Sequence, residues 1–188
     1  MQRIERDAEV QQTINHSRFI GCALPSADVQ ELRARLAGVA GRYSDAHHLA
    51  FAYRIKTPQG LASHCNDAGE PSGTAGRPIL AQMEGANLVN AVVAVVRYFG
   101  WVKLGAGGLV RAYGGTAKLA LEAAVLAPFV EFSELRLSID YPQLQPLTYH
   151  LGKAGGEILS KSFGARVDLV LRLPAAEAPG FRQRFGDG

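Results

Sequence analysis

The chain has 188 residues, of which 47% are hydrophobic and 20% are charged, and its formal net charge is +3 at pH 7. This composition is ordinary for a globular protein of one or two domains, and the small positive charge permits an anionic partner without requiring one. No run of roughly 18 apolar residues predicts a membrane helix, and two cysteines are too few for a disulfide framework. The charged first residues do not resemble a secretory signal, so we expect a cytoplasmic protein with reduced thiols.

The first third of the sequence predicts a strand, a helix and a hairpin. Residues 18–24 mix apolar and small side chains, which is typical of a short strand. A helix is expected from its predicted N-cap, Ser26, to Gly41, because apolar residues recur every three or four positions. Residues 48–63 predict a hairpin around a turn at residues 57–60.

The middle of the sequence predicts a loop, a buried strand and a long helix. Residues 66–76 read NDAGEPSGTAG, which is too rich in glycine and proline for a regular element, and a short helix is expected from Pro78 to Gly85. Residues 91–96 are an uninterrupted run of alanine and valine, typical of a central strand covered on both faces. A glycine-rich bend follows, and residues 109–127 have the periodicity of a helix.

The last third of the sequence predicts a second, smaller domain. Its elements follow the order strand, helix, strand, strand, helix, which is a ferredoxin-like βαββαβ pattern without its last strand. The strands are expected at residues 135–141, 157–163 and 166–173, and the helices at residues 142–154 and 175–185. We therefore predict an α+β protein with domains at residues 1–134 and 135–188, the second of them shorter than a complete ferredoxin-like domain.

The segment from Arg97 to Gly115 carries the most informative chemistry. The buried strand delivers Arg97, and the bend places Lys103 and several glycines before a helix whose free N–H groups and positive dipole end favour an anion. The order of glycines and cations in this segment matches neither a P-loop nor a dinucleotide-binding GxGxxG motif. The alternative that the glycines only permit a tight turn therefore stays open. The residues predicted to contact an anion or nucleic acid are Arg77, Arg97, Lys103, Gly105, Gly107, Gly108, Arg111 and Lys118.

The polar loop at residues 66–76 is a second candidate for function. Asp67 and Glu70 are possible acids, bases or metal ligands, although a structural turn of glycine and proline explains the loop equally well. Ser72 lacks a G-x-S-x-G elbow, which disfavours a Ser–His–Asp hydrolase. Aromatic residues beside the cations can stack on bases or fill the core.

Histidines occur near the same segments, but their spacing does not predict zinc. The candidates are His47, His48, His64 and Cys65. Adjacent histidines on a strand point to opposite faces, and no C-x-x-C pattern is present, so neither a metal nor a cofactor is expected. The residues predicted at the rim of a binding groove are His48, Tyr53, Asp67, Glu70, Ser72, Thr74, Tyr98, Trp101 and Tyr113.

Three segments closely resemble the YigZ/IMPACT family. They are His48-x-x-x-Ala52-Tyr53, the GEPSGTAG run at residues 69–76, and RYFG at residues 97–100 followed by KLGAGGLVRAYGG at residues 103–115. The resemblance covers about residues 15–127 and is weaker beyond them. It implies an N-terminal domain similar to the second domain of ribosomal protein S5 and a C-terminal domain similar to the last domain of elongation factor G.

The resemblance also implies a link to translation. Eukaryotic relatives regulate translation through protein contacts, and bacterial relatives are regarded as nucleic-acid binders. We therefore expect a non-enzymatic regulator that contacts RNA or a ribosome-associated partner. Two alternatives stay open: a nucleotide- or phosphate-metabolite enzyme that uses the same helix start as a cradle and Asp67 or Glu70 as base, and a module that binds only proteins.

Three positions depart from the family pattern. Ala50 stands where a cysteine is common, which argues against a mechanism that needs a thiolate there. Ala68 replaces an acid that often precedes the glycine of the loop. Trp101 stands where a second glycine is usual, so the bend of this chain is expected to be bulkier than that of its relatives.

Overall fold

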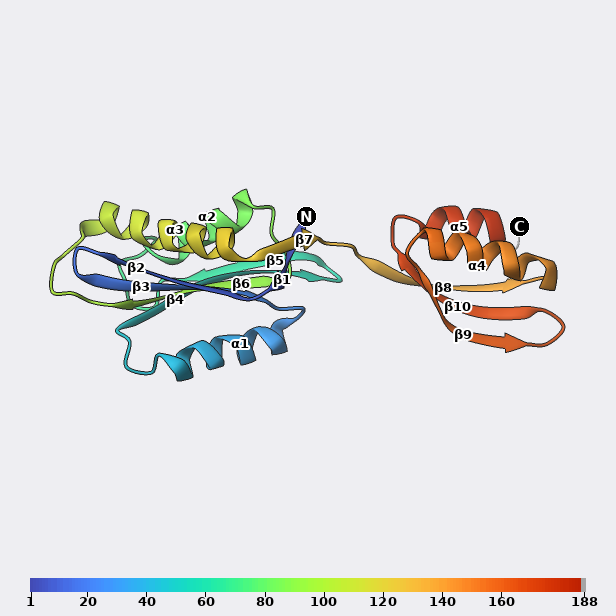
Figure 1. Cartoon of the computed structure of the whole chain (residues 1–188), viewed down its shortest axis with the longest axis horizontal. Helices are drawn as coiled ribbons and strands as arrows, with labels where there is room; N and C mark the ends of the chain where they lie inside the picture. The colour runs from blue at the N-terminus through green and yellow to red at the C-terminus, as the bar shows by residue number, and fades with distance from the viewer. Residues whose placement is uncertain (187–188) are drawn as a thin grey trace. The chain divides into compact units, whose positions relative to one another are not determined.

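A computed structural model describes residues 1–186 of the chain. The chain divides into two compact units, Met1–Phe129 and the part from Val130 onward (Figure 1). The second unit begins before residue 135 because its first strand already starts at Phe132. Among the described residues, no helix is long and apolar enough to cross a bilayer.

The first unit is a five-stranded sheet with helices on both faces. Its elements are β1 (Gln2–Arg6), β2 (Ala8–Ile14), β3 (Ser17–Pro25), α1 (Val29–Arg42), β4 (His48–Thr57), β5 (Gly60–Asn66), α2 (Gly76–Gly85), β6 (Ala91–Tyr98), α3 (Gly105–Ala123) and β7 (Val125–Pro128). The sheet order is β2-β3-β6-β4-β5 with every neighbouring pair antiparallel, and β1 pairs with β7. Helix α1 covers one face, and α2 and α3 cover the other (Figure 1). The predicted mixed α/β fold and central strand are therefore confirmed.

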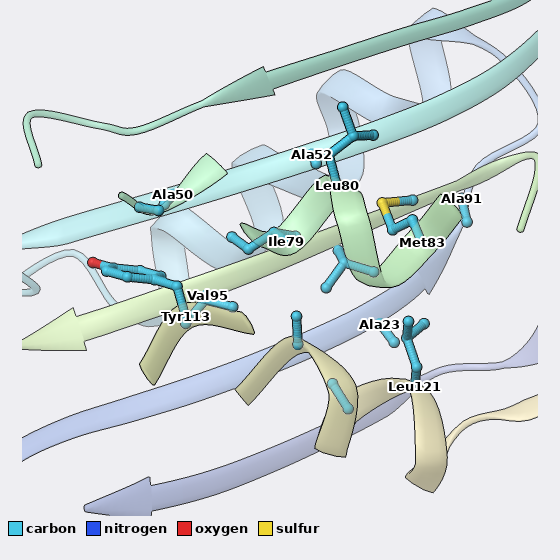
Figure 2. Packing of buried hydrophobic residues seen from close by; sticks show 14 of the residues in the cluster. Ala23, Ala50, Ala52, Ile79, Leu80, Met83, Ala91, Val95, Tyr113 and Leu121 are labelled. Atoms are coloured by element: carbon cyan, nitrogen blue, oxygen red, sulfur yellow. The ribbon is translucent and has the colours of Figure 1, made fainter. Parts of the chain in front are cut away.

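Small side chains on the sheet let α2 and α3 pack closely against it. Figure 2 shows Ile79 and Met83 of α2 and Tyr113 of α3 over Ala50 and Ala52 of the sheet. Gly21 of β3 is required at one contact, because a Cβ atom there would lie 2.8 Å from the Thr116 carbonyl oxygen of α3. The opposite face packs the alternate residues of β3 and β6 against Leu32 and Val39 of α1. Residues of β6 therefore enter both cores, as its continuous apolar run predicted.

The first unit differs from the predicted elements in three places. Strands β1 and β2 were not predicted, since their sequences are mostly polar. The N-cap of α1 is Asp28, whose side chain accepts a hydrogen bond from the Glu31 N–H, rather than Ser26. Helix α3 starts at Gly105 and ends at Ala123, because the residues after it pair with β1 as strand β7.

The second unit has the predicted order of elements. They are β8 (Phe132–Ile139), a 3₁₀ turn η1 (Tyr141–Gln143), α4 (Leu144–Lys153), β9 (Glu157–Phe163), β10 (Val167–Pro174) and α5 (Ala178–Phe185). The sheet order β8-β10-β9 is antiparallel and matches the first three strands of a ferredoxin-like domain. Its core contains apolar side chains of β8 and β10 with Leu147, Leu151, Phe181 and Phe185 of the helices.

Candidate functional site

Two loops meet at the end of the first unit's sheet where β6 finishes and β4 begins. Residues 67–75 form the glycine loop before α2, and residues 99–104 form the Trp101 loop before α3. At this end of the sheet, His48 of β4 lies opposite Arg97 of β6 in the strand pairing. A pocket of about 240 Å³ is lined by Glu70, Pro71, Arg97, Phe99, Lys103, Leu104, Gly105, Ala106 and Leu109. The predicted site residues of the two loops are therefore brought to one place.

A buried ion pair forms the floor of this site. Arg97 Nη1 donates to Glu70 Oε1 over 2.7 Å, and the Tyr113 hydroxyl donates to the same oxygen over 2.7 Å. The side chains of Arg97 and Glu70 are only 5% and 4% exposed. Burial, followed by the hydrogen bond to Glu70, raises the pKa of Tyr113, so its phenol stays neutral and donates.

This arrangement corrects two of the predicted site residues. Arg97 was expected to be a surface cation, but its inward position on β6 buries it and Glu70 neutralises its charge. Tyr113 was expected at the rim, but it lies in the core over the sheet (Figure 2). Arg97 is therefore no free surface cation, and Tyr113 does not form the rim of a groove.

His48 links the floor of the site to the glycine loop. Its Nδ1 lies 2.9 Å from the Ala68 carbonyl oxygen, which accepts and therefore requires the proton on Nδ1. Its Nε2 lies 3.8 Å from Glu70 Oε1, and an ion pair forms there when the ring is protonated. The histidine thus faces the pocket side of the sheet.

Tyr53 lies on the other face of the sheet. Odd-numbered residues of β4, including Leu49 and Phe51, pack with it in the core beside α1. Side chains alternate along a strand, so Tyr53 cannot share a face with His48. Its predicted place at the groove rim is wrong for that reason.

The polar groups of the glycine loop are satisfied inside the loop. Asp67 accepts hydrogen bonds from the N–H groups of Gly73, Ala75 and Gly76 at 2.8, 3.0 and 2.8 Å. Burial alone would raise the pKa of Asp67, but these three donors together lower it below its ordinary value. Asp67 thereby holds the first turn of α2, whose N-cap residue, Ala75, makes no side-chain hydrogen bond.

The same loop corrects a second group of predictions. Thr74 is buried and its hydroxyl donates to the Pro71 carbonyl oxygen over 2.6 Å, so it does not line a groove. Ser72 remains exposed. A Ser–His–Asp triad is not formed, because Asp67 binds backbone N–H groups and His48 Nδ1 binds a carbonyl oxygen.

A series of rings and one guanidinium leads from the core to the tip of the Trp101 loop. The Arg97 guanidinium carbon lies 5.5 Å from the Phe19 ring centroid and 5.2 Å from that of Phe99. The Phe99 and Trp101 centroids are 5.7 Å apart, with the rings tilted by 57°. We call Phe19, Arg97, Phe99 and Trp101 the aromatic column. Phe19 was missed from the sequence, and only its cross-strand pairing with Arg97 reveals its place.

The Trp101 loop is tied to the turn between β2 and β3. The Gly100 N–H donates to Ser17 Oγ over 3.1 Å, and a Cβ atom at Gly100 would lie 2.1 Å from the His16 carbonyl carbon. Trp101 itself is 86% exposed and has a φ of +63°. Left-handed backbone is strained for a bulky side chain and free of strain for glycine.

Tyr98 also reaches the end of the sheet but is held by neighbours. Its hydroxyl donates to Asp45 Oδ1 over 2.6 Å, and the Arg18 guanidinium carbon lies 4.1 Å from its ring centroid. The hydrogen bond from Tyr98 lowers the pKa of Asp45, while acceptance by Asp45 raises the pKa of Tyr98. The Tyr98 ring is therefore already covered on one side.

Four predicted cations remain exposed on the helices and their approaches. We call Arg77, Lys103, Arg111 and Lys118 the cationic helix face. A Cβ atom built at Gly114 of α3 would lie 3.5 Å from Pro78 Cβ, so Arg77 at the start of α2 is brought next to α3. Lys118 Nζ lies 3.8 Å from Glu122, an exposed pair of small energetic weight.

The start of α3 lacks negative charge, whereas the Asp67 carboxylate of the glycine loop binds the start of α2. Neither α2 nor α3 has an acidic residue in its first turn, and their N-cap residues, Ala75 and Leu104, make no side-chain hydrogen bond. Gly105, Gly107 and Gly108 lie in the first turn of α3 rather than before the helix. Across residues 1–186, no group of three or more His, Cys, Asp or Glu side chains is placed to hold a metal ion.

Comparison with known proteins assigns both units to described families. The Impact N-terminal domain matches residues 15–121, and a domain of unknown function (DUF1949) matches residues 137–187. The Escherichia coli protein named IMPACT family member YigZ is 35% identical over 179 residues, covering 95% of this chain and 88% of the relative.

Two further proteins support the same assignment. A Thermus thermophilus protein named IMPACT family member in pol 5′ region is 48% identical over 131 residues, covering 70% of this chain and 69% of that protein. A solved structure titled as that of a hypothetical protein has 33% identity and a TM-score of 0.72, covering 97% of this chain and 89% of its own. The chain belongs to the IMPACT family.

Proposed function

We propose that this protein is a non-enzymatic binding protein linked to translation, which contacts RNA through the cationic helix face. The link to translation comes from the resemblance of its two domains to parts of ribosomal protein S5 and elongation factor G and from the roles of eukaryotic relatives. We propose a cytoplasmic location on the same ground. The ribosome-associated partner expected from the sequence is, in this proposal, one that presents RNA.

The observation that carries the proposal is the uncompensated positive charge at the start of α3. The N-terminal end of a helix has a partial positive charge, and natural helices commonly place acids there. Here Lys103 lies next to Leu104, the N-cap residue of α3, and the first turn of α3 contains no acid. Lys103 is therefore unfavourable in the isolated protein, and a bound phosphate backbone would offset its charge. Arg77 in the first turn of α2 adds positive charge, although the Asp67 carboxylate binds the first N–H groups of that helix.

The contacts of the loop carboxylates favour binding over catalysis. An enzyme that used Asp67 or Glu70 as its base would need one of them free to accept a proton. Asp67 accepts three backbone hydrogen bonds, and Glu70 is paired with Arg97 and bonded to Tyr113. Both carboxylates therefore support the structure of the loop.

The salt dependence of RNA binding tests the proposal. For a labelled single-stranded oligoribonucleotide, log affinity should fall linearly with log salt, by about 0.7 per neutralised phosphate. Arg111→Gln should make that slope shallower by about 0.7, the value for one phosphate contact. The matched control is Arg33→Gln, which removes an exposed cation from α1 on the opposite face of the sheet, and it should leave the slope unchanged.

Three results would overturn the proposal. Absence of saturable RNA binding would leave a module that binds only proteins. Equal slopes for the two variants would show that any RNA binding does not use the cationic helix face. Turnover of a nucleotide by the purified protein would instead favour the enzyme.

A further inference from the structure

We infer that the Trp101 loop binds one unpaired nucleotide, with its base stacked on Trp101 and its phosphate between Lys103 and the start of α3. This inference rests on the proposed function and narrows its ligand class to single-stranded RNA.

The first supporting observation is that the fold does not use Trp101. The ring is 86% exposed, and it belongs to neither core cluster of the first unit. Its φ of +63° is unfavourable for any bulky residue and would be free of strain in glycine. An exposed aromatic ring held in a strained conformation is characteristic of a residue kept for contact with a ligand.

The second observation is that the ring has a neighbour on one side and that the loop backbone is anchored. Trp101 packs on Phe99, Phe99 lies against the Arg97 guanidinium, and Arg97 is fixed by Glu70. Gly100 fastens the backbone to Ser17. A base that stacks on the outer face of Trp101 would extend the aromatic column by one ring, and little conformational freedom would be lost on binding.

The third observation is the positive charge beside the ring. Lys103 follows two residues later and lines the 240 Å³ pocket together with the backbone of Gly105 and Ala106. Arg97 lines the same pocket, and its Nε is buried without a hydrogen-bond partner among the described residues. The Glu70 carboxylate is also present there, but Arg97 neutralises it. The loop thus offers a ring for a base and donors for a phosphate.

A single-stranded ligand fits these features better than a duplex. In a duplex the base faces are already stacked on their neighbours, so they cannot stack on a protein ring. An unpaired nucleotide exposes the face of its base and lets its phosphate turn toward the pocket. Duplex RNA would contact the cationic helix face alone.

Intrinsic fluorescence gives a direct test, because Trp101 is the only tryptophan of the chain. Titration with a single-stranded oligoribonucleotide should change the emission in a saturable way. The corresponding duplex and inorganic phosphate alone should leave the emission nearly unchanged. A full emission change with phosphate alone would overturn stacking, since phosphate has no ring.

Variants provide a second readout, measured by anisotropy of the labelled strand. Trp101→Gly should weaken binding by roughly 5- to 150-fold, which corresponds to about 1–3 kcal/mol for one stacked base. Trp101→Phe should retain most of the affinity. The matched control Tyr149→Ala, which removes an exposed ring from the second unit, should bind as the parent does.

The outcomes separate this inference from the proposed function. Salt-dependent RNA binding with unchanged tryptophan emission and with parental affinity of Trp101→Gly would overturn the inference alone. Absence of RNA binding would overturn the proposed function together with it. A full loss for Tyr149→Ala would assign the stacking to the second unit and also overturn the inference.

Discussion

The glycine loop and the Trp101 loop flank the same pocket but use their residues in opposite ways. The glycine loop is rich in polar residues, and Asp67, Glu70 and Thr74 all make hydrogen bonds to groups of the protein. The Trp101 loop has fewer polar residues, yet it presents an aromatic ring and Lys103 to solvent. A loop rich in polar residues can therefore be structural. The residues of the Trp101 loop that are strained or lack a partner are the better indication of where a ligand binds.

Removal of the Glu70 carboxylate is expected to have the largest effect on stability. Glu70→Ala leaves the Arg97 guanidinium buried without a counter-charge, which should lower the free energy of unfolding by about 3–5 kcal/mol. Urea denaturation measures the loss. Glu84→Ala removes an exposed carboxylate from α2 and serves as the control, with little change expected. A loss below about 1 kcal/mol for Glu70→Ala would show that Arg97 is solvated and that the aromatic column is not fixed.

The Asp67 carboxylate should have a smaller, pH-dependent effect. Its pKa is lowered in the folded state, so its stabilising contribution is fully present above the unfolded value near 3.8 and is lost as the pH falls through the lower folded value. Asp67→Asn should lower the free energy of unfolding by about 1–3 kcal/mol at pH 7. Denaturation curves should show the gap between parent and variant closing in acid. A gap that is equal at pH 7 and in acid would contradict the role of the ionised carboxylate.

Replacement of Trp101 should have the smallest effect on stability. Trp101→Gly releases left-handed strain of about 1–2 kcal/mol and loses a ring contact of about 0.5–1.5 kcal/mol. We therefore expect the free energy of unfolding, measured by urea denaturation, to change by between a loss of about 0.5 kcal/mol and a gain of about 1.5 kcal/mol. A clear loss of stability would show that Trp101 is a structural residue, and the contrast between the two loops would fail.

Much of the architecture could be predicted because local patterns carry it. The continuous apolar run of β6 predicted a strand with two buried faces, and the alternation in residues 135–141 predicted the first strand of the second unit. Strands β1 and β2 were missed, because Val10 and Ile14 alternate with glutamine and threonine and give a weak signal. The sequence predicted that the helix extends to residue 127, whereas α3 ends at Ala123. The residues that follow are apolar, and they form a strand only because they pair with β1.

The site could be located from the sequence, but the use of its residues could not. The motifs around Glu70 and Arg97 identified the right end of the sheet. Their pairing joins residues that are far apart in the chain and depends on the fold of the glycine loop over β6. The burial of Arg97, the position of Tyr53 on the other face and the place of Phe19 all depend on register, which composition does not reveal.

The most direct test of the account is a pair of salt titrations with single-stranded RNA, one for Lys103→Gln and one for Trp101→Gly. Lys103→Gln should make the dependence of log affinity on log salt shallower by the value of about one phosphate contact, because it removes a charge. Trp101→Gly should lower the affinity at every salt concentration without changing the slope, because stacking releases no counterions. Parental slope and affinity for both variants would contradict the claim that this loop binds RNA.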